Sequence, residues 1–293
     1  MRINFADLEE KFSGYDASRV IILPVSYEGT VTYRKGTAKG AKAIIRASRQ
    51  LELYEEETGF EAYRVGIHTA KKVSGNGLSP EEIIDRVYAR GRKLLDDGKF
   101  IVMIGGEHSL SIGMVKAFNE EYRDLSILQL DAHADLREEY GGSRHSHACV
   151  GKRILDFAPL TLLGVRSLRR EDADYISQTE RLNVFYAGKN IGEKRVADKI
   201  ISTLSENVYL TIDLDFLDPS IMPSVGNPEP GGVSWTQAMK FFGYLAQRRN
   251  VVGFDVVELA PLPENIAPDF LAAKLIYKLL TYIIKKKAHR HKG

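Results

Sequence analysis

The sequence predicts an α/β fold, a three-layer αβα sandwich around a mainly parallel sheet. Short apolar runs alternate with amphipathic segments along almost the whole chain, which is typical of repeated β-α units. Several runs are apolar at every position, as strands are when helices cover both faces of a sheet. No internal repeat, low-complexity tract or Pro/Ser-rich linker interrupts the pattern, so we expect a single domain over residues 1–293.

The strands and helices are expected in the following places. The apolar runs that predict strands are Val20–Pro24, Phe100–Ile104, Leu125–Leu130, Leu160–Gly164, Val184–Tyr186, Val208–Leu214 and Val251–Val256. The amphipathic segments that predict helices are Ser79–Gly98, Leu110–Tyr122, Ala148–Phe157, Glu193–Leu204, Ser234–Arg248 and Pro268–Lys285. The clearest helix begins at Ser79, where Ser79 and Glu82 form a capping box around Pro80, and Gly98 supplies its C-terminal cap.

Composition excludes several classes of protein. The 293 residues are 44% hydrophobic and 27% charged, with 41 basic against 39 acidic residues and a net charge of +2, which leaves no basic face for nucleic acid. No apolar run approaches the roughly 20 residues that cross a membrane. The acidic, amphipathic N-terminus does not resemble a signal peptide, and the single Cys149 suits a reducing compartment, so we expect a cytoplasmic protein. The basic C-terminus, residues 286–293, is interpreted as a flexible solvated tail.

Reactive side chains follow four of the predicted strands, at the point where each strand ends. In parallel α/β sheets, sites form where loops leave the carboxyl ends of the strands. The segments concerned are Gly105–Ser109, Asp131–Asp135, Asp213–Pro219 and Val257–Glu258. The sequence therefore predicts that their side chains meet at one edge of the sheet.

These segments carry metal-ligating residue types at every second position. Residues i, i+2 and i+4 of an extended chain face the same side, so Asp131, His133 and Asp135 can converge on one point, as can Asp213 and Asp215. With His108 they offer four carboxylates and two imidazoles. Oxygen and nitrogen ligands without thiolate suit Mn²⁺, and also Fe²⁺, Co²⁺, Ni²⁺ or Zn²⁺. Six ligands exceed the needs of one divalent ion, so a pair of ions roughly 3.5 Å apart and bridged by carboxylate is expected.

Each of these features has a structural alternative when it is taken alone. A single histidine at a strand end is usually structural, and an Asp-x-Asp pair often caps the next helix. The Asp-x-His-x-Asp segment is more specific, and three such features at successive strand ends favour a metal site. Asp218, before Pro219, is interpreted as a turn or helix-start residue and not as a ligand.

Taken together and in order, the motifs resemble the ureohydrolase family, that of arginase and agmatinase, and its agmatinase-like branch in particular. The segments that carry the resemblance are Gly105–His108, Asp131–Asp135, Ser146–Ala148, Asp213–Pro219, Asp255–Glu258, Thr32–Thr37 and Met222–Gly232. The resemblance covers essentially the whole chain.

The resemblance implies a fold, a metal centre and a reaction. The fold would be arginase/deacetylase-like, with an eight-stranded parallel sheet, and the chains would associate as trimers or hexamers. Two Mn²⁺ ions would be held by His108 and Asp135 on one side and by His133 and Asp215 on the other, with Asp131 and Asp213 as bridges. The enzyme would hydrolyse a guanidinium to urea and an amine, and Glu258 would orient that guanidinium through paired hydrogen bonds.

Two further roles are less sharply defined. His147 matches the catalytic histidine that passes a proton to the leaving amine, although His145 lies two residues away and competes for the role. With Glu138 and Glu139, His145 is otherwise expected to bind the substrate. Cys149 is interpreted as a buried packing residue and not as a nucleophile. Glu107 stands where the family commonly has aspartate, and its extra methylene is expected to affect the orientation of His108 and hence metal affinity.

The substrate is expected to be a small cationic guanidine. Glu138 and Glu139 would attract an amine tail and repel a carboxylate, which favours agmatine, hydrolysed to putrescine, over arginine. N1-aminopropylagmatine, a precursor of spermidine, is the alternative in polyamine biosynthesis, and arginine or another guanidino acid is the next. Outside this class, a deacetylase-like amidase with one Zn²⁺ and a non-catalytic, metal-stabilised oligomer stay open.

Overall fold

The structure is a computed structural model that describes residues 4–290. The strands in this range are β1 (Val20–Ser26), β2 (Ile67–Thr69), β3 (Val73–Ser74), β4 (Phe100–Ile104), β5 (Leu125–Leu130), β6 (Leu160–Val165), β7 (Leu182–Tyr186), β8 (Asn207–Asp213) and β9 (Asn250–Val257). The helices are α1 (Glu10–Ser13), α2 (Gly40–Ser48), α3 (Pro80–Asp96), α4 (Leu110–Glu121), α5 (Val150–Ile154), α6 (Arg170–Gln178), α7 (Lys194–Ser202), α8 (Trp235–Arg248) and α9 (Ala267–Arg290). None of the helices in the described range is long and apolar enough to cross a membrane.

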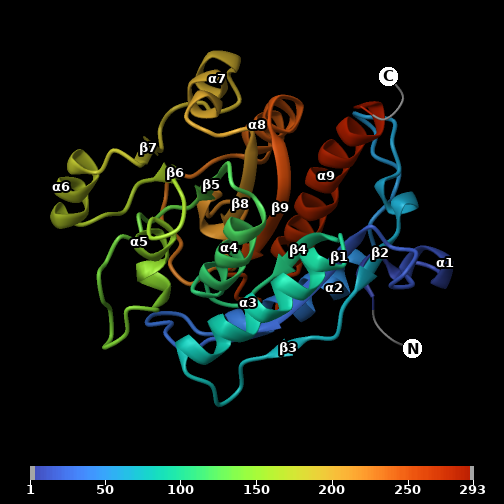
Figure 1. Ribbon diagram of the computed structural model, residues 1–293, viewed down its shortest axis with the longest axis horizontal. Coiled ribbons are helices and arrows are strands. Elements are labelled where there is room, and N and C mark those ends of the chain that lie inside the picture. The colour runs from blue at the N-terminus through green and yellow to red at the C-terminus, as the bar shows by residue number, and fades with distance from the viewer. Residues whose placement is uncertain (1–3, 291–293) are drawn as a thin grey trace.

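The described strands form one parallel nine-stranded sheet (Figure 1). Its order is β2-β1-β4-β9-β8-β5-β6-β7, and β3 pairs with the end of β1. Each strand pair is parallel, as the alternation of strands and helices in the sequence predicted. The α/β expectation is confirmed.

Helices bury both faces of this sheet. On one face α2, α7, α8 and α9 pack against alternate strand residues such as Val20 and Ile22. On the other face α3, α4 and α5 pack against the residues between them, such as Ile21 and Leu23. Because both faces are buried, these strands are predominantly apolar on both sides, which is why they were recognisable from the sequence.

Four adjacent strands in the middle of the sheet carry the candidate site. The chain leaves β4, forms α4 and enters β5, but β9 and β8 lie between these two strands. The connections therefore diverge at this point, and the carboxyl ends of the central strands open into a crevice. The segments that follow β4, β5, β8 and β9 are those in which the sequence placed its reactive residues.

The two shortest strands were missed from the sequence. β2 has three residues and β3 has two, too few for an alternation to be visible. Helices α1, α2 and α6 were also not predicted. By contrast, the predicted capping box of α3 is present, with Glu82 N donating to Ser79 Oγ at 3.2 Å and Ser79 N donating to Glu82 Oε2 at 2.8 Å.

The basic C-terminus, expected to be a flexible tail from residue 286, is helical as far as residue 290. Helix α9 continues through Arg290, and Lys286 Nζ donates to the carbonyl of Arg249 at 2.9 Å. This contact joins the start of the basic segment to the end of α8, and the flexibility of the segment stays a prediction. The rest of the predicted tail, residues 291–293, lies outside the described residues.

Candidate metal centre and cavity

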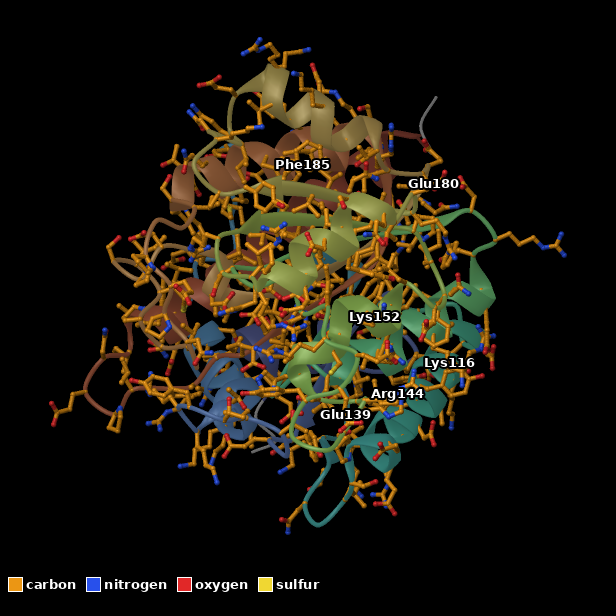
Figure 2. The ribbon with its side chains drawn as sticks, turned by 90° about the vertical axis from the view of Figure 1, so that its left-hand side faces the viewer. Lys116, Glu139, Arg144, Lys152, Glu180 and Phe185 are labelled. Atoms are coloured by element: carbon orange, nitrogen blue, oxygen red, sulfur yellow. The ribbon has the colours of Figure 1, made fainter. Side chains whose placement is uncertain are left out.

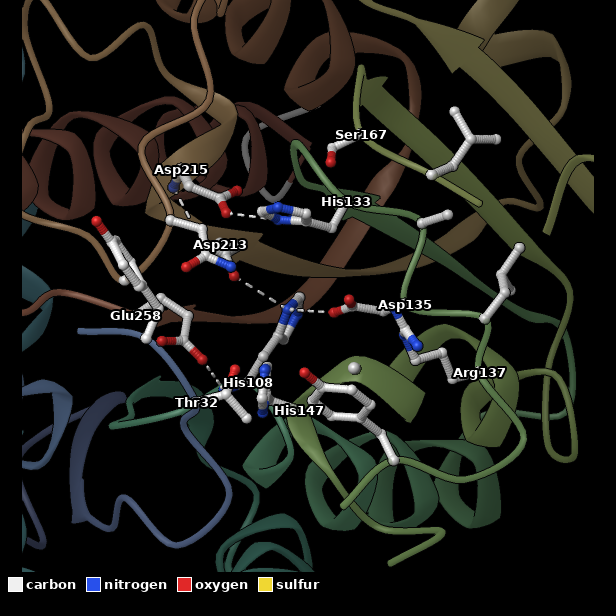
Figure 3. A pocket seen from close by; sticks show the side chains of 18 of the residues that line it. Thr32, His108, His133, Asp135, Arg137, His147, Ser167, Asp213, Asp215 and Glu258 are labelled. Atoms are coloured by element: carbon white, nitrogen blue, oxygen red, sulfur yellow. Dashed lines mark hydrogen bonds and ion pairs between the residues drawn. The ribbon is translucent and has the colours of Figure 1, made fainter. Parts of the chain in front are cut away.

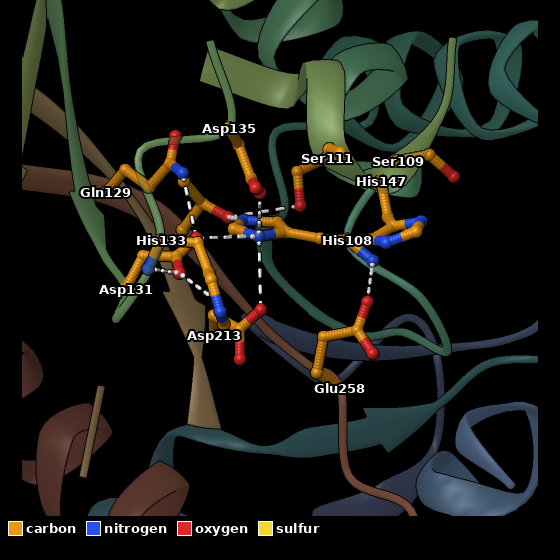
Figure 4. Close-up of polar contacts among 12 residues, drawn as sticks. His108, Ser109, Ser111, Gln129, Asp131, His133, Asp135, His147, Asp213 and Glu258 are labelled. Atoms are coloured by element: carbon orange, nitrogen blue, oxygen red, sulfur yellow. Dashed lines mark hydrogen bonds and ion pairs between the residues drawn. The ribbon is translucent and has the colours of Figure 1, made fainter. Parts of the chain in front are cut away.

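The strand ends bring all six predicted metal ligands to one place (Figures 3 and 4). Two groups of ligand atoms lie within 4.8 Å of one another, His108 with Asp131 and Asp213, and His133 with Asp131 and Asp215. Asp131 belongs to both groups. Two neighbouring cation positions that share one carboxylate are the arrangement expected of a binuclear centre.

The two histidines face the carboxylates through Nδ1. His108 Nδ1 lies 3.1 Å from Asp131 Oδ2, 3.3 Å from Asp213 Oδ2 and 3.5 Å from Asp135 Oδ2. His133 Nδ1 lies 2.8 Å from Asp215 Oδ2 and 3.6 Å from Asp131 Oδ1. The sixth residue, Asp135, thus adjoins the first group through His108.

The backbone anchors one oxygen of three of these carboxylates. His133 N donates to Asp131 Oδ1 at 2.6 Å, Ala132 N donates to Asp215 Oδ1 at 2.9 Å, and Asp215 N donates to Asp213 Oδ1 at 2.9 Å. In each residue the other oxygen, Oδ2, faces a histidine. The carboxylates are therefore held in fixed orientations, which preorganises them for a cation.

Thr211 and Asp255 hold His108 from behind. The Thr211 hydroxyl donates to Asp255 Oδ1 at 2.7 Å, and Tyr209 OH and Ser111 Oγ also donate to this buried carboxylate. Because its single hydrogen goes to Asp255, Thr211 Oγ1 accepts from His108 Nε2 at 2.9 Å. This network assigns the ring hydrogen to Nε2, so Nδ1 is left with a lone pair for a metal ion.

The electrostatics of the cluster favour a cation. Burial raises the pKa of Asp213 well above its usual value, and the nearby Asp215 and Asp131 raise it further. Burial alone would lower the pKa of His133, but Asp131 and Asp215 outweigh it and raise this pKa to about 12. The carboxylates thus repel one another and attract positive charge. Divalent ions relieve the same repulsion.

The residues present fit a metal centre on three counts. His108 Nδ1 is one of the buried polar atoms among the described side chains that have no hydrogen-bond partner, although three carboxylates surround it. Asp131 is fully buried, and a cation would add to the two hydrogen bonds, from His133 N and Gln129 Nε2, that compensate its charge. Oxygen and imidazole ligands without thiolate match the first-row divalent ions.

Two site residues have an unusual backbone conformation. Asp135 and Glu258 are two of the four non-glycine residues with positive φ in the described chain, at 50° and 66°. Such conformations cost on the order of 1–3 kcal/mol and are retained mainly where function needs a particular side-chain direction. At Glu258 the result is that Oε1 accepts from His108 N at 2.6 Å, which places this carboxylate beside the metal-ligating groups (Figure 4).

A cavity of about 240 Å³ opens over this cluster (Figure 3). Its lining includes Glu258, His147 and five of the six predicted metal ligands, the buried Asp131 excepted. Burial raises the pKa of Glu258 well above its usual value, and the charge of Glu107 adds to the shift. A bound guanidinium beside Glu258 would oppose that shift by stabilising the carboxylate.

Three residues expected to bind substrate lie elsewhere. Glu138 is paired with Arg144, with Arg153 at 3.1 Å and with Lys152 at 3.8 Å. Glu139 lies with Arg144 on the outer side of its loop (Figure 2), and His145 Nδ1 lies 2.9 Å from Glu81 Oε1. None of the three is in the described cavity lining, and their contact with the substrate stays a prediction that this position does not favour. The arginines that neutralise Glu138 are near it in the fold, and its sequence neighbourhood did not show this.

Cys149 and Asp218 have structural surroundings that match their predicted roles. Cys149 is fully buried, and burial raises the pKa of its thiol to about 11, so it is a packing residue and a poor nucleophile. Asp218 accepts from the backbone N–H groups of Ser220, Gly231 and Gly232, each at 3.0 Å, which makes it a turn residue as expected.

Several supporting residues were missed from the sequence. Gln129 Nε2 donates to Asp131 Oδ2 at 2.9 Å, and Thr211 and Asp255 support His108. Arg166 Nη2 donates to the backbone carbonyls of Asp215 at 2.7 Å and Glu229 at 2.8 Å, which fixes the turn after β8. Gln129 and Thr211 stand two positions before Asp131 and Asp213 and so share their strand face, a signal that the sequence does contain.

Comparisons with known proteins find relatives and solved structures of similar sequence and fold. A sequence model described as the arginase family matches residues 18–281. The N(1)-aminopropylagmatine ureohydrolase of Synechocystis sp. is 37% identical over 93% of this chain and 92% of its own length. The agmatinase of Pyrococcus horikoshii is 30% identical over 89% and 90% of the two chains. The solved agmatine ureohydrolase of Thermoplasma volcanium superimposes with a TM-score of 0.86 at 29% identity, covering 99% of this chain and 97% of its own.

Proposed function

Because the chain belongs to the arginase family, in which it is a ureohydrolase acting on guanidino groups, we propose that it cleaves a linear cationic guanidine to urea and an amine. The proposed substrates are N1-aminopropylagmatine and agmatine. The family implies a binuclear metal centre, and we propose that the six residues His108, Asp131, His133, Asp135, Asp213 and Asp215 hold two Mn²⁺ ions. Fe²⁺, Co²⁺, Ni²⁺ or Zn²⁺ would suit the same ligands.

The observation that carries the proposal is the position of Glu258. Its carboxylate is fixed by His108 N at 2.6 Å, so a guanidinium that binds Glu258 lies next to the metal-ligating groups. Guanidinium donates paired hydrogen bonds to a carboxylate in one plane, which orients its carbon. When bound, the metal ions supply the activation of water for attack on that carbon.

His147 is proposed to complete the reaction at the leaving nitrogen. Attack of water forms a C–O bond, and the C–N bond to the alkylamine then breaks to give urea. The departing nitrogen must gain a proton, and His147 lines the same cavity as Glu258. A positioned imidazole can donate that proton as a general acid.

The choice between the two substrates is proposed from similarity. The Synechocystis relative named for N(1)-aminopropylagmatine is 37% identical, against 30% for the Pyrococcus relative named agmatinase. We therefore place aminopropylagmatine ahead of agmatine, which reverses the order expected from the sequence alone. Either substrate would make the enzyme part of polyamine synthesis, toward spermidine or putrescine.

A guanidino acid is the second candidate, because a cationic side chain lies in the cavity lining. Arg137 stacks on Tyr140, 4.6 Å from the ring centroid, on the side of the cavity where Asp135 lies (Figure 3). An arginine at this place could bind the carboxylate of arginine or a related acid.

The test is urea release from a guanidine panel by the metal-loaded protein. With aminopropylagmatine, agmatine and arginine compared by kcat/KM, we expect the first to be hydrolysed best and arginine at least about 100-fold worse, a difference of roughly 2.7 kcal/mol in transition-state binding. A preference for arginine would overturn the proposed substrate class and favour the guanidino acid. In that case Arg137→Ala should lower activity on arginine and leave agmatine turnover unaffected.

Two properties outside the site are also proposed. We propose that the chain associates into trimers or hexamers, as the resemblance implies, and light scattering after gel filtration tests this. A cytoplasmic location is proposed from the single buried cysteine, which suits a reducing compartment.

A further inference from the structure

A buried carboxylate beside the site has no role in the chemistry described so far. Glu107 immediately precedes His108 and is fully buried. Its Oε2 accepts from Gly29 N at 2.6 Å and Thr30 N at 2.7 Å, and its Oε1 accepts from Ser109 Oγ at 2.6 Å and Thr30 Oγ1 at 2.7 Å. We expected Glu107 to affect the orientation of the His108 ring. Its carboxylate instead organises the turn at Gly29 and Thr30.

Thr30 connects this carboxylate to His147. Thr30 Oγ1 accepts from His147 N at 3.0 Å and lies 3.0 Å from His147 Nδ1. Ser146 Oγ is also near Nδ1, at the longer distance of 3.4 Å, and it accepts from Ala148 N. The ring of Tyr140 meets the imidazole edge-on, with centroids 5.8 Å apart, so the ring is confined on a second side.

The Thr30 hydroxyl has a single hydrogen, and this determines the direction of each hydrogen bond that it makes. A hydroxyl has one hydrogen to donate and two lone pairs to accept with. The Glu107 carboxylate already accepts three other hydrogen bonds, and Thr30 Oγ1 approaches it more closely than it approaches the ring, 2.7 Å against 3.0 Å. The hydroxyl hydrogen therefore goes to Glu107, and both lone pairs of Thr30 Oγ1 face N–H groups of His147.

We propose that Glu107 and Thr30 are positioning residues that hold the His147 ring with its Nδ1–H on Thr30 and so present Nε2 to the cavity. Through Thr30, the carboxylate of Glu107 then determines which nitrogen of His147 exchanges a proton with the bound molecule. That the exchange is with a leaving amine rests on the proposed function, whereas the ring orientation does not. The arrangement parallels that of His108, in which Thr211 and Asp255 fix the opposite nitrogen.

A double-mutant cycle tests whether Thr30 acts through His147. In the metal-loaded enzyme, Thr30→Val should lower kcat by about 10–100-fold, within the range of acid–base catalysis, and leave KM and metal content near those of the wild type. Thr30→Ser keeps the hydroxyl and should restore most of the turnover. In a His147→Ala background, Thr30→Val should cause no further loss, because the residue it positions is gone.

The contrary result of the cycle is an equal loss in both backgrounds. Thr30 would then support the loop and not the ring, and the proposal would be wrong. Glu107→Gln gives a second route to the same question, because an amide cannot accept all four hydrogen bonds. It should also lower kcat more than it raises KM.

Crystal structures of the metal-loaded variants supply a readout that needs no activity. We expect one His147 orientation, with Nδ1 near Thr30 Oγ1, in the wild type and in Thr30→Ser, and a turned or mixed orientation in Thr30→Val. An unchanged ring in Thr30→Val would overturn the proposal. A wild type that releases no urea from any guanidine would overturn the proposed function instead, and the ring orientations would still decide this inference.

Discussion

Replacing Thr211 with valine is expected to lower metal affinity through the loss of its hydrogen bond to His108. Thr211 is fully buried in β8, and its hydroxyl joins His108 Nε2 to Asp255 Oδ1 at 2.9 and 2.7 Å. Valine has nearly the same shape, so no cavity forms. The change removes the acceptor of the His108 ring hydrogen and one of the donors to Asp255.

Two magnitudes follow from these contacts. A buried polar group without its partner costs about 1–3 kcal/mol, so the metal-free variant should melt roughly 2–6 °C below the wild type. Loss of the group that orients a ligating histidine typically lowers metal affinity by about 10–100-fold. Calorimetric melting of the metal-free protein measures the first effect, and titration with Mn²⁺ measures the second.

Matched variants separate the two effects. Thr161→Val removes a buried hydroxyl from β6, where Thr161 Oγ1 contacts Thr203 Oγ1 at 2.9 Å away from the metal-ligating groups, and it should lower Tm without changing metal affinity. Thr211→Ser should retain both properties in large part. If Thr211→Val binds Mn²⁺ within about twofold of the wild type, the assigned role of Thr211 in orienting His108 is refuted.

Three further outcomes are expected. Asp131→Ala should lose bound metal and urea release together, because Asp131 belongs to both ligand groups; a variant that keeps both ions by elemental analysis would contradict that shared role. Cys149, whose pKa burial raises to about 11, should resist iodoacetamide at pH 8 until the protein unfolds, and rapid labelling of the native protein would show that the thiol is accessible. Burial, followed in size by the charges of Arg19 and Lys286, lowers the pKa of Lys287 from 10.5 to about 8. Above pH 8 the unfolded chain therefore binds more protons than the folded chain. The free energy of unfolding, measured by urea denaturation, should therefore increase as pH rises from about 8 toward 10. In Lys287→Met this increase should be absent.

The sequence predicted the central sheet and the meeting point of the site because both depend on simple patterns. Phe100–Ile104 is apolar throughout and Leu125–Leu130 is mostly apolar, and the structure gives β4 and β5 the same bounds. Parallel strands end at one edge, so residues that follow different strands could be expected to converge there. Neither step needs knowledge of distant contacts.

The parts that could not be predicted depend on contacts between distant segments. Thr30 and His147 are 117 positions apart, and the 3.0 Å contact between them leaves no periodic signal in the chain. Glu138 was expected to face the substrate from its charge and its place in the loop. Its pairing with Arg153 depends on how α5 packs against that loop, which composition does not show.

The central claim is that the strand ends form a binuclear centre that hydrolyses guanidines. Its most direct test is to remove all metal, add Mn²⁺ in known equivalents and measure urea released from aminopropylagmatine or agmatine at each step. The account predicts that activity rises until two equivalents per chain are bound. Full activity at one equivalent, or hydrolysis of an amide substrate without urea, would contradict it and favour a mononuclear amidase.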